Sequence, residues 1–304
     1  MKITAMKNFS GRKLLAICLV STSLIGCSKS AEQTKTDNSA ANSSESSTPV
    51  SVTQANGANE VTMMVGSDIT FPPFEYMENN QPKGFDIDIM DAILAENGTK
   101  PNYIDTRFSN LIPGLDGKKF DAIISGLYIT PERLQKVDMI PYFKTYEALL
   151  VRTEGDFKPK TRDELCGKSV ATQKGAIYPL QIQQFSKESC ESKGKPAITI
   201  KEFETSPQAI QALLSSAVDA QYDDVGVAKE AVKKLNNRVM ISSTDKFIPI
   251  LGGIAVRKGD TETYNKINEG LSKIKASGKY DQLMKQYDLV APTDEESKAA
   301  TSKS

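Results

Sequence analysis

Hydrophobic residues occur in short continuous runs that alternate with stretches of helical spacing. Residues 61–65 (VTMMV) are almost entirely apolar and end at Gly66, which predicts a buried strand. Residues 84–98 carry apolar side chains at helical spacing and end at a glycine, which predicts a helix. Such alternation indicates α/β architecture with a mostly parallel sheet. Further strands are predicted at 120–124, 168–172, 220–224 and 251–257, and further helices at 110–115, 206–217, 261–275 and 278–287.

Three turns from strand to helix, at 67–68, 125–133 and 175–178, are candidate binding positions. In open α/β sheets, ligands gather where strand ends meet helix starts, because backbone N–H groups and helix dipoles converge there. Thr130 and Pro131 predict a helix start, and Arg133 just inside it could grip a carboxylate through two N–H···O bonds. Taken alone, Arg133 is better interpreted as a solvated arginine in the first turn of a helix.

The N-terminus has the pattern of an export signal. Residues 1–26 contain four basic residues and no acid, and the apolar run 14–24 is too short to span about 30 Å of hydrocarbon. The run ends in Leu-Ile-Gly before Cys27, which resembles a bacterial lipobox. This resemblance implies cleavage after residue 26 and acylation of Cys27, including palmitate. The alternative is an ordinary secretory signal with a chance cysteine.

Two polar segments flank the predicted folded part, which spans about 60–290. Residues 27–59 are rich in Ser, Asn, Thr and Ala and offer little to bury, so we expect a flexible, lipidated tether. Residues 291–304 have a similar composition, and we expect a disordered tail.

Composition narrows the chemistry of the 304-residue chain, whose length predicts about two domains. Lys+Arg and Asp+Glu both number 38, so no basic excess favours a nucleic-acid partner. Histidine is absent, which excludes Ser-His-Asp and Cys-His catalysis and zinc sites that need imidazole. Carboxylate chemistry, lysine chemistry or binding without catalysis remain. We expect no cofactor and no metal.

The cysteines agree with an exported protein. Cys18 would leave with the signal and Cys27 would be lipidated, so Cys166 and Cys190 remain in the folded part. Two cysteines in an exported domain favour one disulfide, whose closed loop would contribute about 3 kcal/mol. Two unpaired buried thiols are the alternative.

Several motifs follow one another along the chain. They are 66–76 (GSDITFPPFEY), 83–88 (KGFDID), 111–115 (LIPGL), 119–133 (KFDAIISGLYITPER) and 141–142 (PY). Together they are similar to the periplasmic solute-binding proteins of polar amino acid ABC transporters, solute-binding family 3. The likeness continues at 168–175, 218–224 and 252–257, and so covers nearly all of 60–290.

The resemblance implies a two-lobe periplasmic-binding-protein-like fold of type II, in which two hinge strands join the lobes. Each lobe would be a mostly parallel sheet flanked by helices. Lobe 1 would comprise 60–150 plus 254–290 and lobe 2 would comprise 151–253, with hinges near 149–153 and 251–257. Closure of the lobes over a ligand would desolvate it and strengthen its polar contacts.

The resemblance also assigns roles to individual residues. Arg133 matches the arginine that pairs with a ligand α-carboxylate, surrounded by Ser125 and the backbone of Gly126 and Tyr128. Asp224 matches the acid that accepts the α-ammonium, and strand alternation allows only one of Asp223 and Asp224 to face the cleft. Asp68 matches a contact to the ligand side chain or amine, and Phe71 and Phe108 would be aromatic walls.

At two places the sequence departs from the pattern of the family, and both bear on the choice of ligand. Tyr128 stands where relatives usually have Ser or Thr, so a larger phenol replaces a small hydroxyl. The usual Gly-Thr-Thr of lobe 2 is Gly175, Ala176 and Ile177 in this chain, which removes two hydroxyls. The ligand could therefore be a standard amino acid, an amine or an opine-like compound.

The function that this reading predicts is a receptor rather than an enzyme. A monomer anchored by lipid at the periplasmic face of a bacterial membrane, or on the surface of a Gram-positive cell, would deliver a small polar solute to an ABC permease. One alternative is a cyclohexadienyl dehydratase-like enzyme that uses Glu75, Glu147 or Asp224 as a general acid on prephenate or arogenate. Another is a sensory module that signals through a separate partner.

Overall fold

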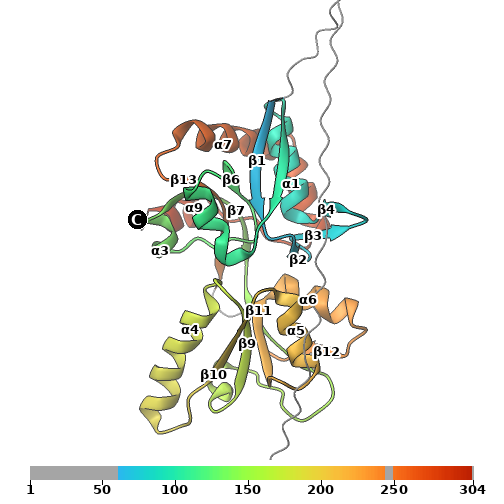
Figure 1. Ribbon diagram of the computed structural model, residues 1–304, viewed down its shortest axis with the longest axis vertical. Helices are drawn as coiled ribbons and strands as arrows, with labels where there is room; N and C mark the ends of the chain where they lie inside the picture. Colours follow the sequence, from blue (N-terminus) through green and yellow to red (C-terminus); the bar gives the residue numbers. More distant parts are fainter. Residues whose placement is uncertain (1–60, 244–248, 303–304) are drawn as a thin grey trace, which may run out of the picture. The chain divides into compact units, whose positions relative to one another are not determined.

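The computed structural model describes residues 61–243 and 249–302, all within one compact unit spanning residues 56–304 (Figure 1). The predicted signal peptide, Cys27 and nearly all of the tether lie outside the described residues. Lobe 1 contains a five-stranded sheet in the order β5-β1-β6-β13-β7. Its strands are β1 (Val61–Ser67), β5 (Thr99–Asp105), β6 (Ala122–Ile123), β7 (Val137–Thr145) and β13 (Ile250–Arg257).

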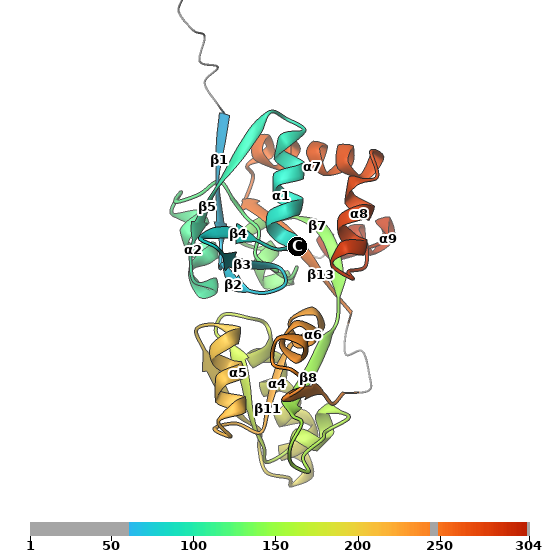
Figure 2. The same ribbon diagram turned by 90° about the vertical axis from the view of Figure 1, so that its right-hand side faces the viewer.

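Helices and a small second sheet complete lobe 1. Helix α1 (Phe85–Ala95) buries Ile89, Met90 and Ile93 and packs against α7 (Figure 2). The second sheet consists of β2 (Thr70–Phe71), β3 (Glu75–Glu78) and β4 (Gln81–Lys83). The other helical segments are η1 (Phe108–Asn110), α2 (Leu111–Asp116), α3 (Pro131–Leu134), α7 (Thr261–Ala276), α8 (Lys279–Gln286) and α9 (Asp294–Thr301).

Lobe 2 repeats the same plan around a sheet in the order β10-β9-β11-β8-β12. Its strands are β8 (Glu147–Arg152), β9 (Ser169–Gln173), β10 (Thr199–Phe203), β11 (Ala220–Asp224) and β12 (Val239–Ile241). Its helical segments are η2 (Arg162–Leu165), α4 (Tyr178–Phe185), η3 (Ser186–Cys190), η4 (Glu191–Lys193), α5 (Ser206–Leu214) and α6 (Val225–Lys234).

Both five-stranded sheets are mixed, not mostly parallel as predicted. In lobe 1, β1 pairs in parallel with β5 and β6, whereas β13 pairs antiparallel with β6 and β7. In lobe 2, β9 pairs in parallel with β10 and β11, whereas β8 pairs antiparallel with β11 and β12. The antiparallel pairs all involve β8 or β13, the strands at which the chain enters one lobe from the other.

The predicted hinges lie several residues away from the observed crossings. Strand β7 ends at Thr145 and β8 begins at Glu147, so the first crossing is at Tyr146 (Figure 2). The segment predicted as the first hinge, 149–153, lies largely in β8, which has a strand on each side in lobe 2. The second crossing lies between Ile241 and Ile250, because β13 already pairs with β7 from Ile250 onward. The lobe boundaries therefore fall near 146 and between 241 and 250.

Local sequence signals are realised in both lobes. The Thr130 side chain accepts a hydrogen bond from the backbone of Arg133 and so caps α3. Thr161 and Glu164, which have the spacing of a capping box, form its two reciprocal hydrogen bonds at the start of η2. Cys166 and Cys190 form a disulfide with their Cα atoms 5.5 Å apart, as predicted.

The C-terminal segment is ordered from residue 294, which contradicts the predicted disordered tail. Thr293 caps α9, and its backbone N–H donates to the Glu296 carboxylate in return. Glu296 also forms an ion pair of 2.5 Å with Lys144 of β7, and Ala300 packs against a core cluster of lobe 1. The prediction weighed only the polar composition, whereas this capping box and two tertiary contacts stabilise a helix.

Candidate functional site

A small cavity lies between side chains of the two lobes. Its volume is about 10 Å³, the space of roughly one water molecule. Seven of the residues that line it are residues that the sequence predicted, and Gln173 and Tyr178 are the additional ones. Lobe 1 contributes Phe71, Phe108, Gly126, Tyr128 and Arg133, and lobe 2 contributes Gln173, Ala176, Ile177 and Tyr178.

Arg133 enters the cavity from the first turn of α3. One guanidinium nitrogen donates to the Tyr128 carbonyl at 2.8 Å and another to the Gly175 carbonyl of lobe 2 at 3.2 Å. The guanidinium also lies 5.4 Å from the centre of the Phe108 ring. Burial lowers the pKa of Arg133 to about 10, so the side chain is charged at neutral pH. The site therefore contains a fixed cation.

Tyr128 of lobe 1 is bonded to lobe 2 through its side-chain hydroxyl. Its hydroxyl donates to Oδ2 of Asp224 at 2.5 Å and lies 2.9 Å from the Tyr178 hydroxyl. The Thr145 hydroxyl donates to the same Asp224 oxygen at 2.8 Å. Burial raises the pKa of Asp224, and burial together with the charge of Asp224 raises the pKa of Tyr128 well above its usual value. Tyr128 is therefore a neutral hydrogen-bond donor to a buried acid.

The alternation along β11 separates Asp223 from Asp224, as expected. Asp224 interacts with Tyr128 and caps α6 through the Gly226 N–H at 2.6 Å. Asp223 accepts instead from the side chains of Ser206 and Gln221 on the other face of the strand. Only Asp224 reaches the group of side chains around the cavity.

The polar groups of three predicted positions in lobe 1 are bonded mainly within that lobe, and Gln173 is the donor from lobe 2. The Ser125 hydroxyl donates to Glu75 at 2.7 Å and accepts from the Asp68 N–H at 2.9 Å. The Gly126 N–H donates to the buried carboxylate of Asp86 at 2.6 Å. The Asp68 carboxylate accepts from Thr70, Phe108 and Gln173 and pairs with Arg107, and the side chain is fully buried. Ser125 and Asp68 thus lie behind the wall of the cavity, not in it.

Burial raises the pKa of two carboxylates behind the wall of the cavity, Asp86 and Glu75. Burial raises the pKa of Asp86 to about 6, and burial together with the charge of Asp86 raises the pKa of Glu75 well above its usual value. Asp86 also accepts from the Tyr142 hydroxyl at 2.7 Å. Asp86 fixes the backbone of Gly126 and Glu75 fixes the side chain of Ser125, which makes both acids structural supports of the cavity.

With this geometry in place, the likeness to known proteins can be stated. The sequence profile of the bacterial extracellular solute-binding proteins, family 3, matches residues 63–289. The chain belongs to this family. The resemblance found in the sequence motifs and the two-lobe α/β fold are both confirmed.

Relatives of this family 3 protein are binding proteins of amino acid transporters. A putative ABC transporter arginine-binding protein 2 of Escherichia coli is 30% identical over 226 residues, which cover 73% of this chain and 88% of the relative. The crystal structure of a mutant arginine-binding protein from T. maritima is 36% identical with a TM-score of 0.68 and covers 74% of this chain and 94% of that one. An ancestral amino acid-binding protein, described as a precursor of cyclohexadienyl dehydratase, is 33% identical with a TM-score of 0.66 and covers 74% and 95%.

Sequence reasoning missed three side chains of this family 3 site. Gln173 ends β9 just before the turn at 175–178 that the sequence analysis marked as a binding position, and Tyr178 is the last residue of that turn, where α4 begins. Arg107 gave no signal, because its partner Asp68 lies 39 positions earlier in the chain. Gly175 fits this turn for a steric reason: its φ is +80°, and a Cβ there would lie 2.9 Å from the Cα of Ser109 in lobe 1.

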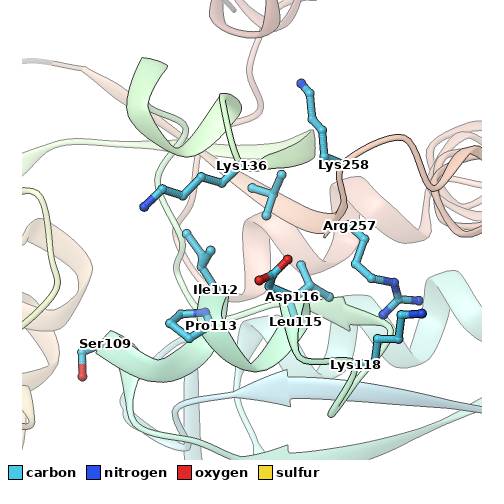
Figure 3. Close-up of a pocket in the computed structure, with 10 residues that line it drawn as sticks. Ser109, Ile112, Pro113, Leu115, Asp116, Lys118, Lys136, Arg257 and Lys258 are labelled. Carbon is cyan, nitrogen blue, oxygen red and sulfur yellow. The ribbon is translucent and has the colours of Figure 1, made fainter.

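A larger hollow of about 740 Å³ lies elsewhere on lobe 1 (Figure 3). None of the residues that line it belongs to the cavity between the lobes. Its basic rim is partly neutralised, because Arg257 pairs with Asp121 and Asp260, and Lys258 pairs with Asp138. Part of the positive charge at the rim of the hollow is therefore already paired with carboxylates of the protein, which leaves less of it for a charged ligand.

In the two described ranges, no cluster of acids and cysteines is suited to a metal ion, and no helix is long and apolar enough to span a membrane.

Proposed function

We propose that this family 3 protein is a receptor that binds a zwitterionic amino acid between its lobes and delivers it to an ABC permease. The observation that carries the proposal is the pairing of one cation and one anion around a single cavity. The Arg133 guanidinium lines the cavity, and the Asp224 carboxylate is hydrogen-bonded to Tyr128, which lines it too.

The charges of the two side chains complement those of an amino acid. A guanidinium can hold an α-carboxylate through two parallel N–H···O bonds. The buried carboxylate of Asp224 accepts from neutral donors and has no counter-charge from the protein among the described residues, so an ammonium group of the ligand would supply one and favour its ionised form. Phe71 and Phe108 supply apolar surface on the same cavity for the ligand's carbon atoms. The names of the relatives, which are arginine-binding proteins, support the same class of ligand.

Binding requires the lobes to move apart and close again. A cavity of about 10 Å³ has no room for an amino acid, and side chains from both lobes enclose it. Within the described residues, β7 of lobe 1 is followed by β8 of lobe 2, and β12 of lobe 2 is followed by β13 of lobe 1, so rotation of the lobes about these two connections would open the site. Closure then removes the ligand from water and strengthens its contacts.

We infer binding without turnover. The likeness to a precursor of cyclohexadienyl dehydratase makes that enzyme the alternative. Of the acids considered for its general acid, Glu75 is enclosed within lobe 1 and bonded to Ser125, and Glu147 is bonded to Tyr222. Neither lines the cavity. Asp224 alone is placed for acid chemistry, and the absence of turnover with prephenate and arogenate is the expected result.

The proposal extends to the N-terminus, which lies outside the described residues. We infer that the chain is exported and that Cys27 is acylated, which would hold the receptor at the periplasmic face of a bacterial membrane, or on the cell surface of a Gram-positive bacterium. Incorporation of labelled palmitate that is lost in Cys27→Ser would support the anchor, and unchanged incorporation would contradict it.

The receptor function is tested by thermal unfolding of protein that has been denatured and refolded to remove bound solutes. Ligand at about a hundred times its dissociation constant adds about 2.7 kcal/mol to the free energy of unfolding, which is roughly 5–10 °C in a protein of this size. We expect this shift with an amino acid, and not with its decarboxylated amine or its deaminated acid.

The matched variants are Arg133→Ala and Arg238→Ala. Arg133 lines the cavity, whereas Arg238 is exposed on lobe 2, so only the first should abolish the shift. A shift that survives Arg133→Ala, or one given equally by the amine alone, would contradict the zwitterion site. Turnover of prephenate or arogenate would favour the enzyme instead.

A further inference from the structure

Asp68 is fully occupied by donors from the protein itself. Its Oδ1 lies 2.8 Å from a guanidinium nitrogen of Arg107 and accepts from the Thr70 hydroxyl at 2.8 Å. Its Oδ2 accepts from the Phe108 N–H at 3.0 Å and from the Gln173 amide at 3.1 Å. The Asp68 side chain is 0% exposed, so no water competes for the remaining positions. Both oxygens and the negative charge are thus already satisfied.

Arg107 is held in place by lobe 1 alone. The parallel register of β1 and β5 pairs Ser67 with Asp105, so the residues that follow the two strands meet. The Arg107 guanidinium reaches Asp68 and the Thr70 hydroxyl with one nitrogen and Asp105 with the other. All these anchors are in the same lobe, so the pair persists whether the lobes are open or closed.

The ion pair of Asp68 and Arg107 lies directly behind the wall of the cavity. Phe108, the residue after Arg107, lines the cavity and also donates its N–H to Asp68. Gln173 lines the cavity from lobe 2 and donates its amide to the same oxygen. A ligand side chain that extends past these two residues therefore meets an acid whose charge Arg107 has cancelled.

We propose that Arg107 takes the place of a cationic ligand side chain at Asp68, so that this receptor selects amino acids with uncharged side chains and excludes arginine, lysine and ornithine. The inference rests on the proposed function and specifies its substrate class. A basic side chain would have to displace Arg107 or lie beside it, and two like charges next to the same buried acid repel each other. The relatives named as arginine-binding proteins therefore differ from this chain in the ligand that they select.

The test compares dissociation constants for arginine, lysine, ornithine and a panel of uncharged amino acids, measured by calorimetry on the refolded protein. We expect the preferred uncharged amino acid to bind at least about tenfold more tightly than any basic one. Arg107→Ala leaves a buried acid without a counter-charge, so it should tighten the binding of basic amino acids by about tenfold or more. Arg107→Lys keeps the positive charge and should give no such gain, and neither should Arg238→Ala.

The outcomes separate this inference from the proposed function. Tight binding of arginine or lysine by the unaltered protein, with dependence on Arg133 and no change in Arg107→Ala, would overturn the role of Arg107 and leave the amino acid receptor intact. Binding of no amino acid of any class would overturn both. If Arg107→Ala does not fold, the ranking of ligands by the unaltered protein decides the matter.

Discussion

Asp68 and Asp224 are both buried acids at the edge of the same cavity, yet their surroundings differ in charge. Asp68, in lobe 1, pairs with the Arg107 guanidinium at 2.8 Å. Asp224, in lobe 2, accepts only from neutral donors, which include the hydroxyls of Tyr128 and Thr145 and the Gly226 N–H. Among the described residues no lysine or arginine forms an ion pair with Asp224. Asp68 therefore has a counter-charge supplied by the protein, whereas Asp224 has none among the described residues.

This difference shows that the position of an acid does not by itself define a cation subsite. Hydrogen bonds from neutral donors stabilise a carboxylate without cancelling its net charge, whereas a guanidinium does both. The family motifs locate both acids, but only the identity of their donors tells which one can still attract a ligand cation. In this protein that acid is Asp224.

The largest expected effect is a difference in amino acid affinity between the variants Asp224→Asn and Asp68→Asn. Removing one partner of a buried charge pair typically costs 2–5 kcal/mol, so we expect Asp224→Asn to weaken amino acid binding by about thirtyfold or more. Asp68→Asn should change the affinity for an uncharged amino acid by less than about tenfold, because Arg107 already uses that charge. Calorimetric titration of both variants checks this, and equal losses would mean that the two acids share the ligand.

A disulfide variant controls for general loosening of lobe 2. Cys166→Ser opens the bond to Cys190 and should reduce the free energy of unfolding by about 3 kcal/mol without touching Asp224. We expect its affinity to stay close to that of the unaltered protein. If Cys166→Ser weakened binding as much as Asp224→Asn, the effect of the latter would reflect stability instead of charge.

Tyr128→Phe should have a smaller effect of opposite sign. The Tyr128 hydroxyl lies 2.5 Å from the Asp224 oxygen that an ammonium group would contact. Its removal takes away a competing donor, so we expect amino acids to bind about tenfold more tightly. Titration calorimetry measures the change. Weaker binding would show that the phenol and the ligand donate to Asp224 together.

The smallest expected effect concerns Asp223, the neighbour of Asp224 on the opposite face of β11. Burial raises the pKa of Asp223 from 3.8 to about 7. Between these two values the folded protein holds a proton that the unfolded chain has lost, so the free energy of unfolding falls as the pH rises. Asp223→Asn should flatten this slope by about 1.4 kcal/mol per pH unit at most. Denaturant unfolding at several pH values tests it, and an unchanged slope would contradict the raised pKa.

Signals that depend on neighbouring residues could be predicted from the sequence. The cap at Thr130, the capping box at Thr161 and the strand that begins at Val61 follow from local spacing, and the structure contains all three. The family motifs added the positions of Arg133 and Asp224, which local patterns alone could not have connected. The two-lobe fold was predictable because the same motifs identify the family.

Features that depend on pairing between distant segments could not be predicted. The meeting of Asp68 and Arg107 requires the β1–β5 register, and β5 was not among the predicted strands because Lys100, Pro101 and Asn102 interrupt its apolar pattern. The crossing at Tyr146 follows from which sheet β8 joins, a choice made by its partners. Helix α9 depends on the ion pair of Glu296 with Lys144, 152 positions earlier.

Because α9 is attached to lobe 1, the distance between the two lobes can be followed by energy transfer between two dyes. Lys144 binds Glu296 just before the chain crosses into the other lobe, so the C-terminal helix travels with lobe 1. Exposed Ser302 follows that helix, and exposed Lys193 belongs to lobe 2 near the Cys166–Cys190 disulfide. Two dyes at these positions would sit on opposite sides of the hinge and outside the cavity. Energy transfer between them would then report the opening and closing of the lobes, one molecule at a time.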